Sequence, residues 1–168
     1  MFKERMVKAI NEQINAEFYS AYLYLSMESW FRSQNLDGFA NWMRVQFQEE
    51  QFHAMKLYDF VNERGGSVTL TAIAEPPKEW KSPLAVFEAV YKHEQMVTSR
   101  IDLLVDLAQK LKDHATLSFL QWFVDEQVEE ESNDLAIINK LKLVAEAPGG
   151  MFMIDKELAA RVFTPPAE

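Results

Sequence analysis

The segment MRVQFQEEQFHAMKLYDFV, residues 43–61, places apolar side chains every three or four positions, as one buried face of a helix does. That face is interrupted at its middle, where Glu50 and His53 stand at positions that suit Leu. The two residues lie three apart and therefore share one side of the helix. This pattern predicts a helix that contributes ionisable groups to the interior of a helical bundle.

Three further segments repeat the apolar period of roughly 3.5 residues, each with a polar interruption near its middle. The interrupting residues are Glu17 in the first segment, Glu94 in the third, and Gln127 with Glu130 in the fourth. Glu17 precedes Glu50 by 33 residues, and Glu94 precedes Gln127 by the same number. Turns near residues 35 and 112 would fold each half back on itself and bring these side chains to one height.

Capping residues, glycine and proline set the expected helix boundaries. Ser82-Pro83 is typical of a helix start, and Gly65-Gly66 is typical of a helix end. The segment 65–81 has no helical period and is long enough to run the length of the bundle. We therefore expect one domain over residues 1–168, all α, in which two antiparallel hairpins are joined by one long crossover. Its helices are expected at about 4–33, 37–64, 82–111 and 114–145, with a short fifth helix at about 154–162.

The amino-acid composition argues against several classes of function. The chain has 168 residues and no cysteine, which excludes disulfides, Cys-zinc sites and thiol catalysis. Its net charge of −9 and lack of a basic stripe disfavour binding to nucleic acid. Because it shows neither a secretory signal pattern nor a run of 18 apolar residues, we expect a cytoplasmic protein without a membrane partner.

Carboxylates on buried helix faces indicate a metal site, because each buried charge costs several kcal/mol unless it is neutralised. No lysine or arginine interrupts the same faces. Carboxylates with one imidazole favour iron or manganese over copper or structural zinc. We expect Glu50 to bridge two ions, with Glu17 and His53 on one and Glu94 and Glu130 on the other. Gln127 is expected as a weak ligand or a hydrogen-bonding neighbour.

Simpler interpretations compete with these assignments. A Glu-x-x-His match alone is weak, and a lone buried histidine is more often a core residue than a ligand. The set Glu49, Glu126 and Glu129 has the spacing of an ordinary solvated face. Tyr24 and Trp122 have spacings that suit either core packing or a place beside the metals. His93 and His114 are expected to be exposed.

Longer motifs in the chain resemble those of the bacterial non-haem ferritins. They are NEQINAEFYSAYLY around Glu17, QEEQFHAM around Glu50, DEQVEEE around Gln127, and GGMFMIDKEL at the start of the fifth helix. The resemblance covers nearly the whole chain and is more specific than Glu-x-x-His alone.

The resemblance implies a ferritin-like bundle that stores iron and oxidises Fe(II) with O2 or H2O2 at a di-iron ferroxidase centre. It places Glu17, Glu50, His53, Glu94 and Glu130 at that centre, with Gln127 and Tyr24 beside it. It also implies a third iron site at Glu49, Glu126, Glu129 and Glu130, no haem, and a homo-oligomeric cage of 24 subunits.

Other families of the same superfamily fit less well. Bacterioferritins carry Glu-x-x-His in the fourth helix, where this chain has Gln127 and Glu130, and Gln51 occupies the position of their haem-binding methionine. Rubrerythrin-like peroxidases need a cysteine-bound iron. DNA-protecting mini-ferritins usually lack the fifth helix. A cage subunit that binds iron without oxidising it is a further alternative, but it would be expected to lack several inward ligands.

Overall fold

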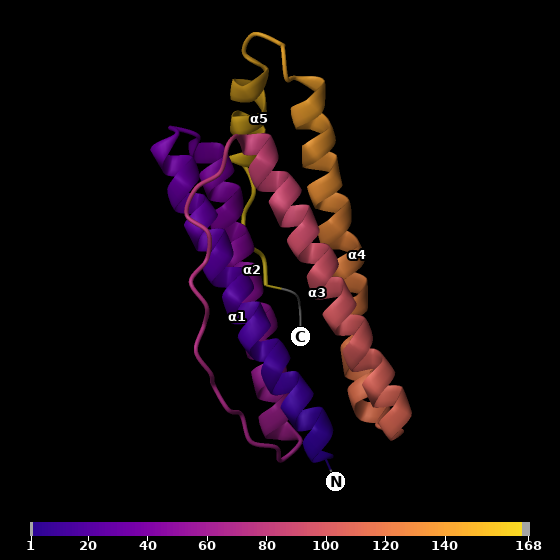
Figure 1. Cartoon of the computed structure of the whole chain (residues 1–168). Coiled ribbons are helices and arrows are strands. Elements are labelled where there is room, and N and C mark those ends of the chain that lie inside the picture. Colours follow the sequence, from indigo (N-terminus) through magenta and orange to yellow (C-terminus); the bar gives the residue numbers. More distant parts are fainter. Residues whose placement is uncertain (1, 166–168) are drawn as a thin grey trace.

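The computed structural model describes residues 2–165; residues 1 and 166–168, the ends of the predicted domain, lie outside this range. The described chain forms five helices: α1 (Glu4–Ser33), α2 (Asp37–Glu63), α3 (Pro83–Leu111), α4 (His114–Leu143) and α5 (Gly150–Leu158). The first four lie side by side along one direction, and α5 sits at one end of them (Figure 1). The all-α prediction, with a four-helix bundle and a short fifth helix, is confirmed.

The turns inside the two hairpins are short. Asn35 and Lys112, which follow α1 and α3, adopt left-handed conformations with φ of 58° and 53°, and such a residue commonly ends a helix. Ser82 and Asp113 then cap α3 and α4, because their side chains accept hydrogen bonds from the backbone N–H groups of Ala85 and Thr116. Each pair of helices is therefore antiparallel, as the sequence predicts.

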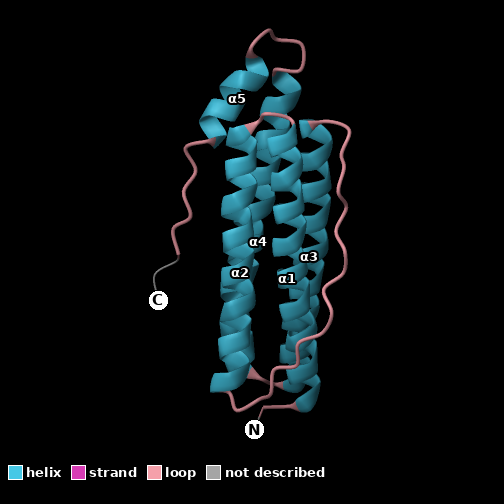
Figure 2. Ribbon diagram, turned by 90° about the vertical axis from the view of Figure 1, so that its left-hand side faces the viewer, coloured by secondary structure: helices cyan, strands magenta, loops and turns pink. Residues whose placement is uncertain are grey.

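The crossover between α2 and α3 runs along the whole bundle, as Figure 2 shows. Two asparagines of α1 hold its first half in place. The Asn11 side chain donates to the carbonyl of Ser67 and accepts from the N–H of Thr69, and Asn15 donates to the carbonyls of Thr71 and Ala72. α3 can therefore start beside the start of α2 and run parallel to it. In the described part of the chain, no helix is long and apolar enough to cross a membrane.

The fifth helix differs from its predicted range of about 154–162. It begins at Gly150, directly after Gly149, whose left-handed backbone (φ 75°) provides the turn into the helix. It ends at Leu158, where the Asn41 side chain donates to the carbonyls of Leu158 and Arg161. The apolar spacing that suggested a later end relied on Val162, which is 77% exposed.

Contacts between α5 and α2 fix the end of the bundle. The Asp155 carboxylate accepts hydrogen bonds from the N–H groups of Gly38 and Phe39, and so caps α2 from another helix. Gly38 is required there, because an added Cβ would lie 1.6 Å from the Asp155 carbonyl oxygen. α5 and residues 159–161, which follow it, are thus held closely against the start of α2.

Candidate metal centre

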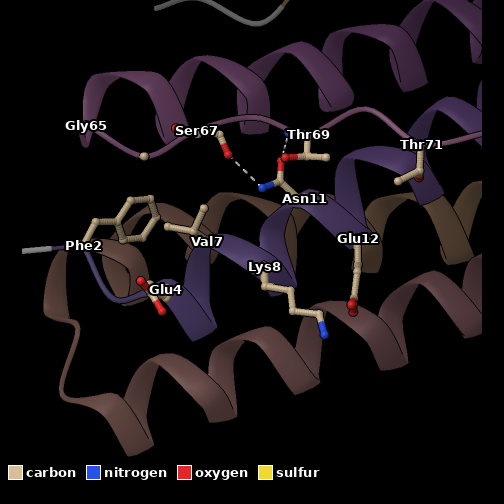
Figure 3. Close-up of a pocket in the computed structure, with 11 residues that line it drawn as sticks. Phe2, Glu4, Val7, Lys8, Asn11, Glu12, Gly65, Ser67, Thr69 and Thr71 are labelled. Atoms are coloured by element: carbon tan, nitrogen blue, oxygen red, sulfur yellow. Dashed lines mark hydrogen bonds between the residues drawn. The ribbon is translucent and has the colours of Figure 1, made fainter.

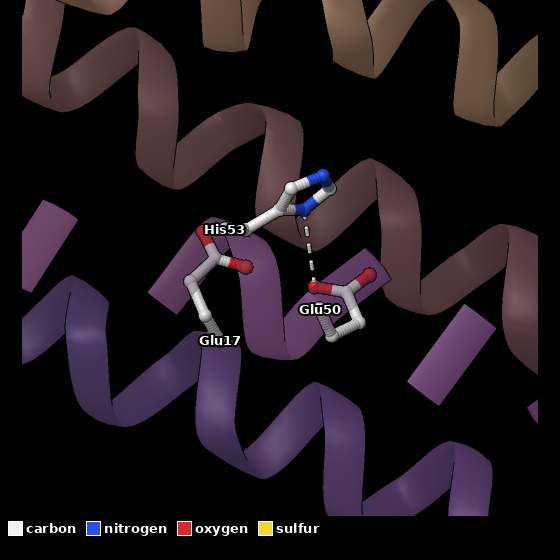
Figure 4. Close-up of side chains that lie close together, drawn as sticks. All are labelled: Glu17, Glu50 and His53. Atoms are coloured by element: carbon white, nitrogen blue, oxygen red, sulfur yellow. Dashed lines mark ion pairs between the residues drawn. The ribbon is translucent and has the colours of Figure 1, made fainter. Parts of the chain in front are cut away.

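Glu17 of α1 meets Glu50 and His53 of α2 in the middle of the bundle. Each side chain is at most 3% exposed, and one potential ligand atom from each lies within 4.8 Å of the others. Figure 4 shows the three groups facing one another, with the Glu50 Oε2 to His53 Nδ1 contact of 3.4 Å marked. The antiparallel hairpin thus brings together residues 33 and 36 positions apart, as the spacing predicts.

The second hairpin adds groups on the other side of His53. His53, Glu126 and Glu130 form another set whose ligand atoms lie within 4.8 Å of one another. Glu94 is fully buried and accepts hydrogen bonds from the Tyr24 hydroxyl and from Gln127 Nε2, the latter at 3.1 Å. Glu94 belongs to neither of the two compact sets, but Tyr24 and Gln127 hold it in the same interior.

Burial dominates the electrostatics of these groups. It raises the pKa of Glu50 well above the usual range, and with nearby Glu94 and Glu49 it raises the pKa of Glu130 to about 8. Burial also raises the pKa of Glu94. Burial alone would lower the pKa of His53, but its contacts with Glu126 and Glu50 raise it well above the usual value. Without a cation, the centre therefore retains protons at neutral pH.

The donor set fits a metal cation. Glu17 Oε2 and Glu50 Oε2 are buried and accept no hydrogen bond, which is costly for oxygen atoms in a protein interior. Among the described residues, no lysine or arginine forms an ion pair with Glu17, Glu50, Glu94 or Glu130. A bound cation would supply the missing partner for these oxygens. Carboxylates with one imidazole suit iron or manganese, as the sequence suggested.

Comparison with known proteins places this chain in a family. Residues 7–144 match the family model described as a ferritin-like domain. A bacterial non-heme ferritin of Bacteroides fragilis is 45% identical over 161 residues, covering 96% of this chain and all of that protein. Another, from Staphylococcus saprophyticus, is 44% identical and covers 97% of this chain and 98% of its own.

The chain belongs to the ferritin family.

Solved structures agree with this placement. An engineered closed form of the Archaeoglobus fulgidus ferritin superimposes with a TM-score of 0.96 at 60% identity, covering 98% of this chain and all of that one. The open pore ferritin of the same archaeon superimposes with a TM-score of 0.95 at 59% identity, covering 96% and 99%. The resemblance to non-haem ferritins is therefore confirmed.

The predicted third set is only partly assembled in this ferritin. Glu126 lies 3.7 Å from His53 Nε2. Glu49 is instead paired with Arg161, whose Nη2 lies 2.6 Å from Glu49 Oε2. Glu129 is exposed and joins neither compact set of potential ligands. A site made by all of these carboxylates stays a prediction.

The aromatic and histidine predictions have mixed outcomes. Tyr24 is fully buried against Glu94, and burial raises its pKa well above the usual value. Trp122 stacks edge-on against His53, with ring centroids 5.4 Å apart, so it lines the centre. His114 is exposed as expected. The expectation for His93 was wrong, because it is buried with its Nε2 2.8 Å from Ser20 Oγ, and burial lowers its pKa to about 4.

Two buried glutamines beside the centre were missed by sequence reasoning. Gln13 Nε2 donates to Glu17 Oε1 at 2.7 Å, and Gln46 Nε2 donates to Glu130 Oε2 at 2.7 Å. Gln13 lies four residues before Glu17, and an amide one helical turn from a candidate ligand was the available signal. Gln46 meets Glu130 across the bundle, and no sequence spacing indicates that contact.

A surface cavity of about 570 Å³ lies away from these residues. It is formed by the first turns of α1 and the start of the crossover, and Figure 3 shows Asn11 crossing it to the backbone at Ser67. None of the predicted ligands lines it. The chemistry of this ferritin is therefore assigned to the bundle interior.

Proposed function

We propose that this ferritin stores iron and oxidises Fe(II) at a di-iron centre formed by Glu17, Glu50, His53, Glu94 and Glu130. Bacterial non-haem ferritins are ferroxidases. The observation that carries the proposal is the buried cluster itself. Glu17 and Glu50 form one compact set with His53, Glu130 joins His53 in another, and Glu94 is buried in the same interior. Among the described residues, no lysine or arginine pairs with these four glutamates.

Iron enters as the substrate. Glu17 and His53 would hold one Fe(II), Glu94 and Glu130 would hold the second, and Glu50 would bridge them. Two Fe(II) ions each lose one electron to O2, which takes up two protons and leaves as H2O2. H2O2 can in turn take one electron from each of two further Fe(II) ions, together with two protons, and form two water molecules. Anionic oxygen ligands stabilise Fe(III) over Fe(II), which favours the oxidation.

Proton release should accompany metal binding. Ligand carboxylates must be ionised and the ligand imidazole must be neutral. The pKa values of Glu50, Glu130 and His53 are all raised in the metal-free protein. Fe(II) would therefore displace protons at neutral pH, and binding should weaken as pH falls. The partly exposed Glu126 offers these protons a route toward solvent.

Three finer assignments belong to the same proposal. A third iron position at Glu49, Glu126, Glu129 and Glu130 would receive iron as it leaves the centre. The cage would contain 24 copies of this 19.5 kDa chain, about 470 kDa in all. It would store ferric mineral in the cytoplasm without haem. Sedimentation analysis would measure the mass, and a smaller closed oligomer would contradict the cage size.

Oxygen consumption on adding Fe(II) to the iron-free cage tests the function. We expect rapid uptake for the first two Fe(II) ions per subunit, with an absorbing ferric product. In Glu17→Ala and in Glu130→Ala, uptake should be sharply slower. A subunit that only carries iron would bind Fe(II) without consuming oxygen, and unchanged rates in both variants would contradict the assigned centre.

A further inference from the structure

Two candidate ligands, Glu17 and Glu130, are each reached by a chain of the same composition, an arginine followed by a buried glutamine. Arg100 Nε donates to Gln13 Oε1 at 2.9 Å, and Gln13 Nε2 donates to Glu17 Oε1 at 2.7 Å. Arg161 Nη1 donates to Gln46 Oε1 at 2.8 Å, and Gln46 Nε2 donates to Glu130 Oε2 at 2.7 Å. The two chains end on glutamates that belong to different compact sets of potential ligands.

Donor and acceptor chemistry fixes the direction of both chains. Arginine only donates hydrogen bonds, so the amide oxygen of each glutamine must face the guanidinium. The amide NH2 must then face the glutamate, and a glutamate oxygen accepts its hydrogen bond. Gln13 and Gln46 are at most 1% exposed, so water does not compete for these contacts. Each chain therefore fixes the position of one oxygen of its glutamate.

The remaining glutamate oxygen is left for the metal. Glu17 Oε1 holds Gln13, whereas Glu17 Oε2 is buried without any hydrogen-bond partner. In Glu130, Oε2 holds Gln46, and a ligand atom of Glu130 lies within 4.8 Å of those of His53 and Glu126. A carboxylate held by one oxygen presents the other in a single orientation, which lowers the cost of ordering it on metal binding.

The two arginines lie outside the buried cluster of four glutamates. Arg100 lies on α3, and Nη2 of Arg100 also donates to the carbonyl of Glu12. Arg161 follows α5, lies over the Trp42 ring at 4.4 Å, and pairs with Glu49. Because Asn41 binds the Arg161 carbonyl, the docking of α5 sets the position of this guanidinium.

We propose that Arg100 and Arg161 are positioning residues of the iron site, acting through Gln13 on Glu17 and through Gln46 on Glu130. Neither arginine contacts the predicted di-iron ligands directly. Arg161, three residues after the end of α5, thereby supports the centre, although α5 itself lies at the end of the bundle. The proposal rests on the proposed function, since it assigns Glu17 and Glu130 to different metal positions.

Zn²⁺, a redox-inert divalent cation, is the probe for the test. Crystals of the assembled wild-type protein are soaked at a Zn²⁺ concentration that half-fills the bundle sites, and anomalous scattering gives the occupancy of each position. Arg100→Met and Gln13→Met should lower the affinity of the Glu17 position by about tenfold, within the range seen for groups that support metal ligands. Arg161→Met and Gln46→Met should lower the affinity of the Glu130 position by the same factor. Each pair of variants should change the Zn²⁺ affinity of the position it does not support by less than about threefold.

Arg44→Met is the matched control, because Arg44 pairs with buried Glu28, which is not a candidate ligand. It should leave both occupancies unchanged. Arg161→Lys should recover only part of the loss, because one ammonium group does not reproduce the two-point contact with Gln46 and Glu49. If the buried glutamine variants fail to assemble, the partly exposed arginines still carry the test.

A kinetic measurement complements the Zn²⁺ occupancies: the Fe(II) concentration at which the initial oxidation rate is half of its maximum. It should rise in the arginine variants more than the maximal rate falls. Occupancies within twofold of wild type, or an equal loss in Arg44→Met, would overturn the positioning role. Failure of the wild-type protein to bind Zn²⁺ in the bundle or to consume oxygen with Fe(II) would instead refute the proposed function.

Discussion

The two hairpins, α1–α2 and α3–α4, carry polar residues at the same 33-residue spacing, yet they differ in what they contribute. The first supplies Glu17, Glu50 and His53, which form a compact set by themselves. The second supplies Glu94, Gln127 and Glu130, and its Glu130 reaches such a set only with His53 of the first hairpin.

The first hairpin alone therefore supplies a compact set of potential ligand atoms, whereas the second supplies one only together with its neighbour. The supporting contacts cross in both directions, since α3 holds Gln13 through Arg100 and α2 holds Glu130 through Gln46. The proposed five-ligand centre would therefore form only when the two hairpins are packed together. Substitution of a residue that links the two hairpins should therefore affect Fe(II) oxidation more than substitution of a residue that acts within one hairpin.

The largest effect is expected from Glu50→Ala, which removes the predicted bridge between the two metal positions. We expect initial Fe(II) oxidation to slow by about a hundredfold, at the upper end of the effects seen when only supporting groups are lost. Stopped-flow absorbance measures the rate. Glu63→Ala, which removes an exposed glutamate from the same helix, should leave the rate unchanged. Equal rates in the two variants would contradict the bridging role.

Gln127→Glu tests the asymmetry between the hairpins by placing a carboxylate beside Glu94. Another buried anion should lower the melting temperature of the metal-free protein by about 5 °C, the shift expected for a loss of 1–3 kcal/mol. It should also raise the Zn²⁺ affinity of the second hairpin's position by about tenfold. Calorimetry checks both quantities, and Gln127→Met is the control without added charge. An unchanged affinity would show that residue 127 faces no metal.

Asp134→Asn probes a buried carboxyl group that only the second hairpin has, one turn beyond Glu130. Its oxygens have no hydrogen-bond partner, and burial raises its pKa to about 9. A folded-state pKa above the unfolded value means that the stability from this group is lost as pH rises from about 4 toward 9. The free energy of unfolding of the variant, relative to that of the wild type, should therefore increase with pH by at most about 1.4 kcal/mol per pH unit over this range. Thermal unfolding of both metal-free proteins between pH 6 and 9 measures this difference in stability. A difference that does not change with pH would contradict the raised pKa of Asp134.

The smallest effect is expected from Tyr24→Phe, which removes only the hydrogen bond from the first hairpin to Glu94. A hydrogen bond is worth about 1 kcal/mol, so the initial oxidation rate should fall by about fivefold or less. The same stopped-flow measurement checks it, with Tyr22→Phe, an exposed neighbour, as the control. A loss as large as that of Glu50→Ala would indicate that Tyr24 takes part directly in electron transfer.

Sequence reasoning reached the bundle and most of its interior groups, because both follow from periodic spacing along single helices. Glu17, Glu50, Glu94 and Glu130 interrupt apolar faces, and two short turns bring them together. The hydrogen bonds that orient these glutamates were harder to predict from the sequence. Gln46 meets Glu130 across 84 residues and Arg161 meets Gln46 across 115, distances at which local periodicity carries no information. His93 was misjudged for a similar reason, since its partner Ser20 lies on another helix.

The central claim is that the two hairpins together hold two iron ions in the bundle interior. Crystals of the assembled protein soaked anaerobically with Fe(II), with data collected on either side of the iron absorption edge, test it most directly. We expect two anomalous peaks per subunit, one beside Glu17 and His53 and one beside Glu94 and Glu130, with Glu50 between them. A single peak, or iron bound only on the protein surface, would contradict this account.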